Sequence, residues 1–273
     1  MRKPLSLYHP VLYWLRVNQR RLFKKLAWYC SNRRYAHTLQ PHNKLTHRYI
    51  KHTSKLIRHF AGVDLQLQYN KVTNLKIAVN SVNGIVIRPH DYFSFCKLVG
   101  KPTQQRGFVE GMELSFGKAQ AGIGGGICQL SNLIHWMVLH SPLQVVERSH
   151  HSFDPFPDEG RVLPLGSGAA IFYNYVDLVI YNPTSTTFQI HLKVAEHQLE
   201  GELLADTPSA IKYHVYEKNS QFIQIQQQVF RKNEIWRDTI SKGHQPQCLA
   251  STLLYKNQAR VNYPVDASLL QPS

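Results

Sequence analysis

The most informative absence in this sequence of 273 residues is that of acidic side chains from its N-terminal part. Residues 1–63 contain fourteen lysines and arginines and no aspartate or glutamate, whereas the rest of the chain is nearly neutral. The net charge of +15 therefore belongs to one segment and not to the whole folded body. Since a nucleic-acid binder carries positive charge over its contact face, the sequence does not favour a nucleic-acid partner.

Cysteines are few and widely spaced, at positions 30, 96, 128 and 248, with no CxxC pair and no short Cys/His spacing. This pattern predicts neither a metal site nor a disulfide framework, and we expect no cofactor. It is typical of a reducing compartment. Also absent are a signal-peptide core and an apolar run of the about 18–20 residues that a membrane span needs. We therefore expect a cytoplasmic protein.

The basic segment has the pattern of an amphipathic helix over residues 11–29, with leucines and aromatic residues near helical spacing between arginines and lysines. Two interpretations stay open. In one, the apolar stripe packs on the protein's own body. In the other, the helix attaches to an acidic partner or to an anionic membrane surface, which would make the protein peripheral on the inner membrane face.

Glycine is concentrated in front of a second helix, which the apolar periodicity predicts over residues 127–140. Gly124, Gly125 and Gly126 permit a backbone with positive φ that approaches something closely. The wheel of this helix has one apolar face and one polar face with Cys128 and His135, so we expect it to be half-buried. Unpaired N–H groups at such a helix start favour an anion or a thiolate.

Short alternating segments predict β-structure elsewhere. Asn83-Gly84 is expected to join two of them in a hairpin, and further turns are expected at residues 218–220 and 232–233. The predicted strands cover residues 75–79, 85–87, 143–148, 171–173, 176–181, 188–194, 198–204, 211–217, 221–231 and 234–240. The predicted fold is α+β: an antiparallel sheet with the glycine-led helix packed on it. Its predicted parts are a separable basic helical arm (1–62), a core domain (63–205) and a β-rich extension (206–273).

A family resemblance rests on the glycine-rich run and on three segments around it. The run GGGICQLSN (124–132), followed by Glu147-Arg148 and His151-Ser152, resembles the signature of the VanW family, accessory proteins of vancomycin B-type resistance clusters. The runs NGIVIRPHDYFSF (83–95) and GSGAAIFYNYVDLVIYNP (166–183) are also similar to that family. The resemblance spans about 75–205 and implies a role in glycopeptide resistance and cell-wall peptidoglycan metabolism, without a mechanism. Gly168 departs from it, since relatives are expected to have a carboxylate there.

Three functions remain open on these residues. The first is a non-catalytic module that binds an anionic or peptide wall-precursor ligand at the glycine-rich helix start. Its expected ligand-binding residues are Gly124, Gly125, Gly126, Gln129, Ser131, Asn132, Glu147 and Arg148. The second is an enzyme, and the third is a structural or protein-interaction role.

The enzyme hypothesis assigns a nucleophile to Cys128, a base to His151 and an orienting carboxylate to Asp177. A helix-borne cysteine followed by a histidine and an acid on strands is typical of papain-like and transglutaminase-like hydrolases. The family pattern matches His151 and not His150. His135 is excluded as the partner because seven residues of helix place it about 10 Å from Cys128. The activity would be acyl transfer or peptide hydrolysis.

Overall fold

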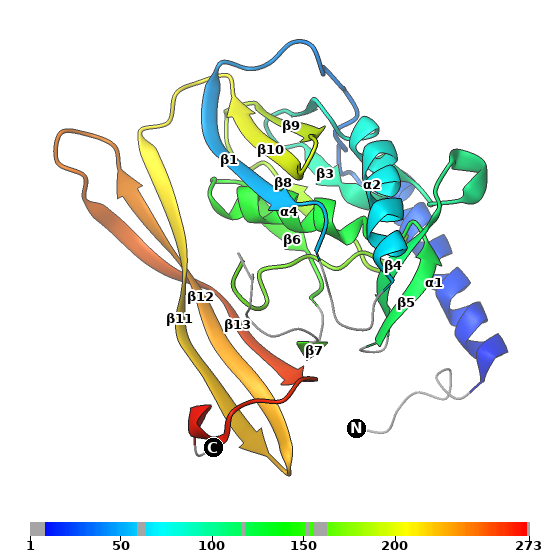
Figure 1. The fold of residues 1–273 in the computed structure, drawn as a ribbon. Coiled ribbons are helices and arrows are strands. Elements are labelled where there is room, and N and C mark those ends of the chain that lie inside the picture. Colours follow the sequence, from blue (N-terminus) through cyan, green and yellow to red (C-terminus); the bar gives the residue numbers. More distant parts are fainter. Residues whose placement is uncertain (1–8, 59–63, 116–117, 151–152, 155–162, 272–273) are drawn as a thin grey trace.

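The computed structural model describes residues 9–58, 64–115, 118–150, 153–154 and 163–271. The fold is α+β with antiparallel sheets, as predicted (Figure 1). Within the described residues the helices are α1 (Pro10–Cys30), α2 (Leu65–Asn80), α3 (Phe95–Val99) and α4 (Cys128–Leu139). The strands are β1 (His47–Lys55), β2 (Ile85–Ile87), β3 (Tyr92–Ser94), β4 (Glu110–Ser115), β5 (Lys118–Ile123), β6 (Gln144–Glu147), β7 (Phe153–Asp154), β8 (Val179–Tyr181), β9 (Phe188–Val194), β10 (Gln198–Ala205), β11 (Ile211–Ile225), β12 (Gln228–Ser241), β13 (Cys248–Val261) and β14 (Leu270–Gln271).

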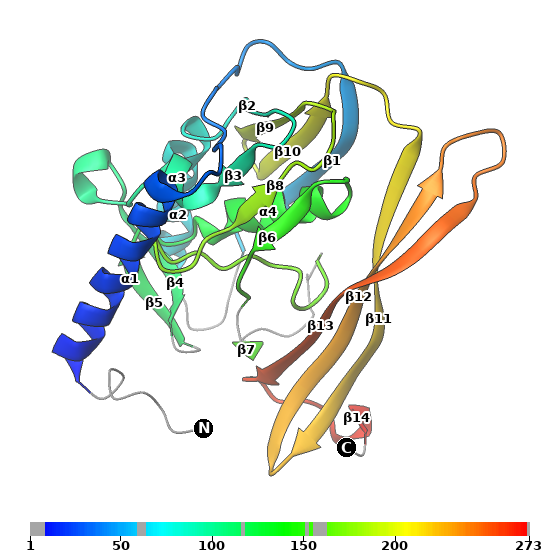
Figure 2. The same ribbon diagram turned by 180° about the vertical axis from the view of Figure 1, so that it is seen from behind.

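The main body is built around α4. The sheet β1-β10-β9-β2 lies over this helix, and the sheet β3-β8-β6 and α2 complete the surroundings (Figures 1 and 2). Leu130, Leu133, Ile134 and Met137 of α4 belong to the main apolar core. Strand β10 passes close to the helix, because a Cβ on Gly201 would lie 2.8 Å from the terminal methyl group of Met137.

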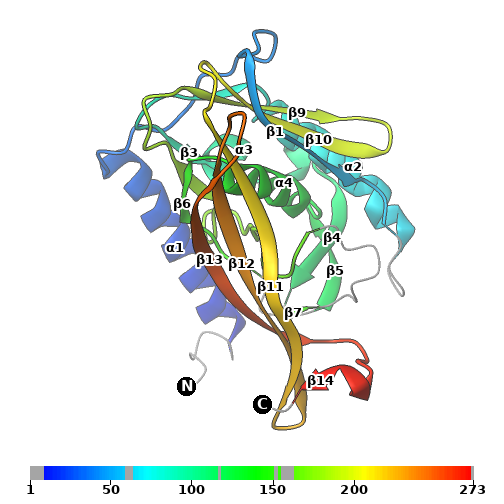
Figure 3. The ribbon, with the colours of Figure 1, turned by 90° about the vertical axis from the view of Figure 1, so that its left-hand side faces the viewer.

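The three longest strands, β11, β12 and β13, form an antiparallel ribbon along one side of the body (Figure 3). A second, smaller core joins this ribbon to the outer side of α4, through Trp136 and Leu139 of the helix and Val215 and Ile235 of the ribbon. Helix α4 therefore has apolar contacts on two sides, which explains why nine of its twelve residues are buried, more than the half-buried helix that was predicted.

The predicted separate arm is wrong for its second half. Residues 47–55 form strand β1, which pairs antiparallel with β10 along nearly its whole length. Just after it, Leu56 is 1% exposed in the main core, and Tyr35 and Leu39 make β-bridges to Tyr92 and Ile85. Histidines, lysines and arginines occupy most positions around the few apolar residues of β1, so the sequence pattern of this segment does not indicate a strand. Within the described part of residues 1–62, α1 takes no part in β-pairing.

Two local predictions are also wrong. Residues 75–79, predicted as a strand, belong to α2, which Asp64 caps by accepting a hydrogen bond from the Gln66 backbone N–H at 2.8 Å. Its buried positions recur at helical spacing but include polar residues, which hid the period. The turns expected at 218–220 and 232–233 lie inside the long strands. The chain instead reverses at Gln226-Gln227, both of which have positive φ.

Candidate functional site

The glycine-rich start of α4 is packed against the protein's own chain. Gly124 and Gly126 have φ of 81° and 90°, as predicted for a left-handed backbone. A Cβ on Gly125 would lie 2.1 Å from the carbonyl oxygen of Gly111, and one on Gly126 would lie 2.1 Å from the Lys71 side chain. The close approach that these glycines permit is therefore an approach to the start of β4 and to α2.

Several N–H groups of this turn are engaged within the chain. The Gly124 N–H donates to Val109 O at 3.0 Å, and that of Gln129 donates to Gly126 O at 3.0 Å. The Asn74 amide clamps the same turn, since its Nδ2 donates to Gly125 O at 2.9 Å and to Val109 O at 3.0 Å. These donors hold the turn in place and are not directed at a ligand.

The three residues of the enzyme hypothesis are not shown as a triad. The Cys128 thiol contacts Ile171 O at 3.8 Å, and burial raises its pKa, with a further raising effect from Glu113. This direction is opposite to the one expected for a nucleophile at a helix start. His151 lies outside the described residues, so its distance from Cys128 remains untested.

Asp177 has a local structural role next to β8. One carboxylate oxygen accepts a hydrogen bond from Ser94 Oγ at 2.6 Å, and the other accepts one from the Cys96 N–H at 2.8 Å. These contacts hold the start of α3. Burial raises the pKa of Asp177, while the two hydrogen bonds act in the opposite direction. The partner that this buried carboxylate requires is therefore supplied by α3.

The predicted polar residues of α4 bind neighbouring backbone. Gln129 Nε2 donates to Ser54 Oγ and to Lys55 O, both at 2.8 Å. Ser131 Oγ donates to Ala169 O at 2.7 Å, and Asn132 Oδ1 accepts from the Ala169 N–H at 2.7 Å. These side chains fix β1 and the segment 163–171 to the helix.

Arg148 and His135 hold the same segment from two more directions. Arg148 Nη1 donates to Gly166 O at 2.5 Å and to Gly168 O at 2.9 Å, and its guanidinium lies 3.9 Å from the centre of the Tyr255 ring. The His135 Nδ1 atom lies 2.7 Å from Ser167 O. Burial, with a smaller effect of Arg148, lowers the pKa of His135 to about 3, so this imidazole is neutral. The structure thus brings Ser131, Asn132 and Arg148 together on one backbone segment.

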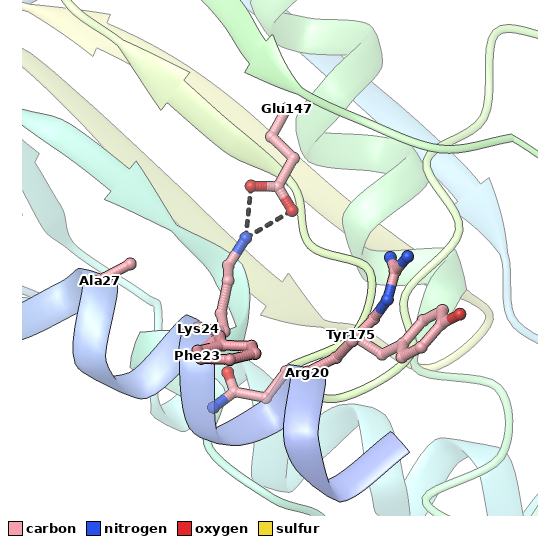
Figure 4. A pocket seen from close by; sticks show the side chains of 7 residues that line it. Arg20, Phe23, Lys24, Ala27, Glu147 and Tyr175 are labelled. Atoms are coloured by element: carbon pink, nitrogen blue, oxygen red, sulfur yellow. Dashed lines mark hydrogen bonds and ion pairs between the residues drawn. The ribbon is translucent and has the colours of Figure 1, made fainter. Parts of the chain in front are cut away.

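Glu147, the remaining predicted ligand-binding residue, lies elsewhere, in an open pocket between α1 and the turn before β8 (Figure 4). The pocket has a volume of about 380 Å³. Its lining residues are Arg20, Phe23, Lys24, Ala27, Glu147, Asn174 and Tyr175. Lys24 Nζ pairs with both carboxylate oxygens of Glu147, and the Arg20 guanidinium lies 5.0 Å from the centre of the Tyr175 ring.

Asn174 gives this pocket an unusual polar group. The residue is 0% exposed, and its backbone has a φ of 54°, which is uncommon for a residue other than glycine. Its Oδ1 atom has no hydrogen-bond partner among the described residues, while its Nδ2 makes a long contact of 3.5 Å to Arg21 O. A buried oxygen of this kind is costly unless a donor from elsewhere reaches it.

Glu147 is the only residue of this pocket that the sequence predicts as ligand-binding. The cations belong to the segment predicted as a separable arm, and Asn174 lies between the predicted strands 171–173 and 176–181. A signal was present in the pair Arg20 and Lys24, which are four residues apart and so share one helix face. The basic residues facing the body, and not the leucines, mark where α1 meets it.

Comparison with known proteins gives a consistent result. A family model described as VanW like protein matches residues 70–204. The chain is 30% identical over 272 residues to the Vancomycin B-type resistance protein VanW of Enterococcus faecalis (strain ATCC 700802 / V583), a match that covers 98% of this chain and 97% of that protein. It is 31% identical over 100 residues to the uncharacterized protein YoaR of Bacillus subtilis (strain 168), covering 36% and 33% of the two chains. No solved structure matches.

Fold and site together define an α+β protein whose signature residues hold one backbone segment against a central helix. The match to the Enterococcus faecalis protein along nearly the whole chain identifies the family. This chain belongs to the VanW family. The predicted resemblance over about 75–205 is thereby confirmed, and the two ends of the chain are now included in it.

Proposed function

We propose that this protein is a VanW-like accessory protein of glycopeptide (vancomycin-type) resistance that binds an anionic wall precursor in the pocket beside α1. The observation that supports this ligand class is the set of groups around the pocket. Arg20 and Lys24 supply positive charge, of which Lys24 is paired with Glu147, and the buried Oδ1 of Asn174 lacks a donor among the described residues. A ligand with a phosphate next to amide or hydroxyl groups, such as a nucleotide-linked muramyl peptide, offers both.

The pocket is a better candidate than the glycine-rich turn for physical reasons. The N–H groups of Gly124 and Gln129 donate to Val109 O and Gly126 O, and the space in front of Gly125 is filled by Gly111. The family resemblance to a resistance protein supports the cell-wall context. A cytoplasmic site agrees with four free cysteines, two of which, Cys30 and Cys248, are exposed.

No observation on the described residues favours the alternative that the protein is a thiol enzyme. Burial raises the pKa of Cys128, and Asp177 is engaged by Ser94 and Cys96. A role limited to packing or protein interaction accounts for the glycine-rich turn. It does not explain why the buried Oδ1 of Asn174 has no hydrogen-bond partner among the described residues.

Titration calorimetry with UDP-linked muramyl pentapeptide tests the proposal on the full chain. We expect binding that Arg20→Gln weakens about tenfold, the loss of one charge-assisted hydrogen bond. Asn174→Gly should also weaken it, since glycine keeps the positive φ while the amide is lost. Lys193→Gln, an exposed cation on β9 away from the pocket, is the matched control and should have no effect.

The outcome against this proposal is equally clear. Absence of binding at ligand concentrations of about 1 mM, or equal affinities of the wild type, Arg20→Gln and Asn174→Gly, would exclude the pocket as the precursor site. Binding of the non-phosphorylated muramyl peptide with the same affinity would remove the phosphate from the recognised groups.

A further inference from the structure

Helix α1 is oriented with its apolar side away from the protein. Most of its large apolar side chains are exposed, at 46% for Leu12, 50% for Leu15, 56% for Leu22, 59% for Phe23 and 48% for Leu26. Successive positions three, four and seven residues apart share one face of a helix, so these side chains form a continuous outward stripe. Figures 2 and 3 show the helix at the periphery of the body with its outer side uncovered by the described chain.

The opposite face is held to the body mainly by polar contacts. Arg21 Nε donates to Tyr173 O at 3.2 Å, and its guanidinium lies 5.3 Å from the centre of the Phe172 ring. Lys24 pairs with Glu147, and Val17 is 6% exposed. These contacts fix the rotation of α1 about its axis. The outward stripe is thus a feature of the folded protein, and it leaves a large apolar surface in contact with water.

From this orientation we propose that α1 docks the protein on an anionic membrane surface, lying in the interface with its apolar stripe among the acyl chains. The stripe is flanked by the exposed cations Arg20 and Lys25, the arrangement of interfacial helices that bind anionic lipid. Trp14 and Tyr29, 62% and 81% exposed, are amphipathic aromatic side chains of the kind enriched at the membrane–water interface. No helix in the described part of the chain is long and apolar enough to cross a membrane.

Charge favours a bilayer over a second copy of the chain. Residues 1–63 contain no acidic side chain, so two α1 helices packed by their stripes would bring their basic flanks together without partners. Like charges at such distances repel, whereas anionic lipid headgroups would neutralise them. The pocket and the membrane-facing side of α1 share Phe23 and Arg20, but Leu15, Leu22 and Leu26 do not line the pocket, so changing these leucines tests the membrane surface separately from the ligand.

Flotation of the full chain with phosphatidylglycerol vesicles tests the proposal. We expect binding that weakens severalfold between about 0.05 M and 0.5 M salt, and that is weaker still on phosphatidylcholine vesicles. The variant Leu15→Gln/Leu22→Gln/Leu26→Gln should need on the order of tenfold more lipid for half binding. Leu249→Gln is the matched control, because Leu249 is 57% exposed on β13, and it should bind like the wild type.

Circular dichroism of each variant verifies that the fold is retained, which is expected because the altered side chains are exposed. Failure of the wild type to bind phosphatidylglycerol, or unchanged binding of the triple variant, would overturn the proposal. A wild-type dimer that becomes monomeric in the triple variant, without any membrane binding, would overturn it in favour of a second copy. Equal, salt-insensitive binding to both lipids would overturn the anionic requirement.

Discussion

Helix α4 hides nearly every side chain, polar ones included, whereas helix α1 presents most of its large apolar side chains to solvent. Ser131 and His135 are both 0% exposed in α4, and each has a backbone carbonyl partner. In α1 the residues that face the body include Arg21 and Lys24, and the leucines face outward. In both helices polar side chains are among those that meet the body, so the polarity of a single side chain does not tell which face is buried.

The difference separates two kinds of information. Buried polar groups with complete hydrogen bonding describe how the body is held together, because leaving any of them unpaired would cost about 1–3 kcal/mol. A continuous stripe of exposed apolar groups contributes little to that body and carries the membrane surface proposed above. In this protein the family signature around α4 is of the first kind, and the basic N-terminal helix is of the second.

Truncation tests this contrast with the largest expected effect. Removal of residues 1–62 takes away β1 and the buried Leu56, which leaves an edge of β10 unpaired, so we expect loss of cooperative thermal unfolding. Removal of residues 1–30 alone should lower the melting temperature by only about 5 °C, since the lost ion pair and contacts are at the surface. Calorimetry of both truncated chains measures this. Cooperative thermal unfolding after removal of residues 1–62 would support the prediction that these residues form a separable arm.

Packing at the start of α4 is tested by Gly125→Ala. The added Cβ meets the backbone of Gly111, which cannot move as a flexible side chain does, so we expect a loss of about 3 kcal/mol in the free energy of unfolding. Gly243→Ala, where nothing lies within 4 Å, is the control and should change it by less than about 0.5 kcal/mol. Urea denaturation reports both. An unchanged midpoint for Gly125→Ala would show that the turn has room for a ligand.

The neutral His135 makes the stability of the α4 region depend on pH. Burial lowers its pKa in the folded state to about 3 from 6.5, so between these values the unfolded chain binds a proton that the folded protein excludes. The stabilisation is complete above pH 6.5 and is lost as the pH falls toward 3. Over that range we expect wild type to lose up to about 4 kcal/mol more than His135→Gln. Unfolding free energies at pH 7, 6, 5 and 4 should therefore converge for the two proteins. A constant difference would contradict a neutral His135.

Sequence patterns predicted the part of the fold in which polarity follows burial. Strand β9 was predicted over the residues it occupies, and α4 within one or two residues, because their apolar residues recur at the right period. Helix α2 was missed because Gln68, Lys71 and Asn74 occupy buried positions in it. Strand β1 was missed because its exposed side chains are basic. In both cases tertiary contacts outweigh the local pattern.

Among the residues that line the pocket beside α1, only Glu147 is a ligand-binding residue predicted from the sequence. Glu147 and Arg148 are neighbours in sequence, yet one lies in the pocket beside α1 and the other binds Gly166 and Gly168, since successive residues of an extended chain point to opposite sides. The roles of Asn174 and Lys24 depend on which surface α1 lies against. That choice depends on contacts between residues more than a hundred positions apart, such as Lys24 and Glu147.

The contrast between α1 and α4 also applies to their cysteines, Cys30 and Cys128. Apart from the controls, substitution of Cys128 is the change expected to affect stability least. Cys30 ends α1 and is exposed, whereas Cys128 begins α4 and has a pKa that burial raises. Because the thiolate is the reactive form, iodoacetamide at pH 7.5 should modify Cys30 at least about tenfold faster than Cys128. Peptide mapping by mass spectrometry over time measures the two rates, and in denaturant they should become similar. Cys128→Ser should change the free energy of unfolding by about 1 kcal/mol. Faster modification of Cys128 in the folded protein would instead support activation by His151, and with it the thiol enzyme.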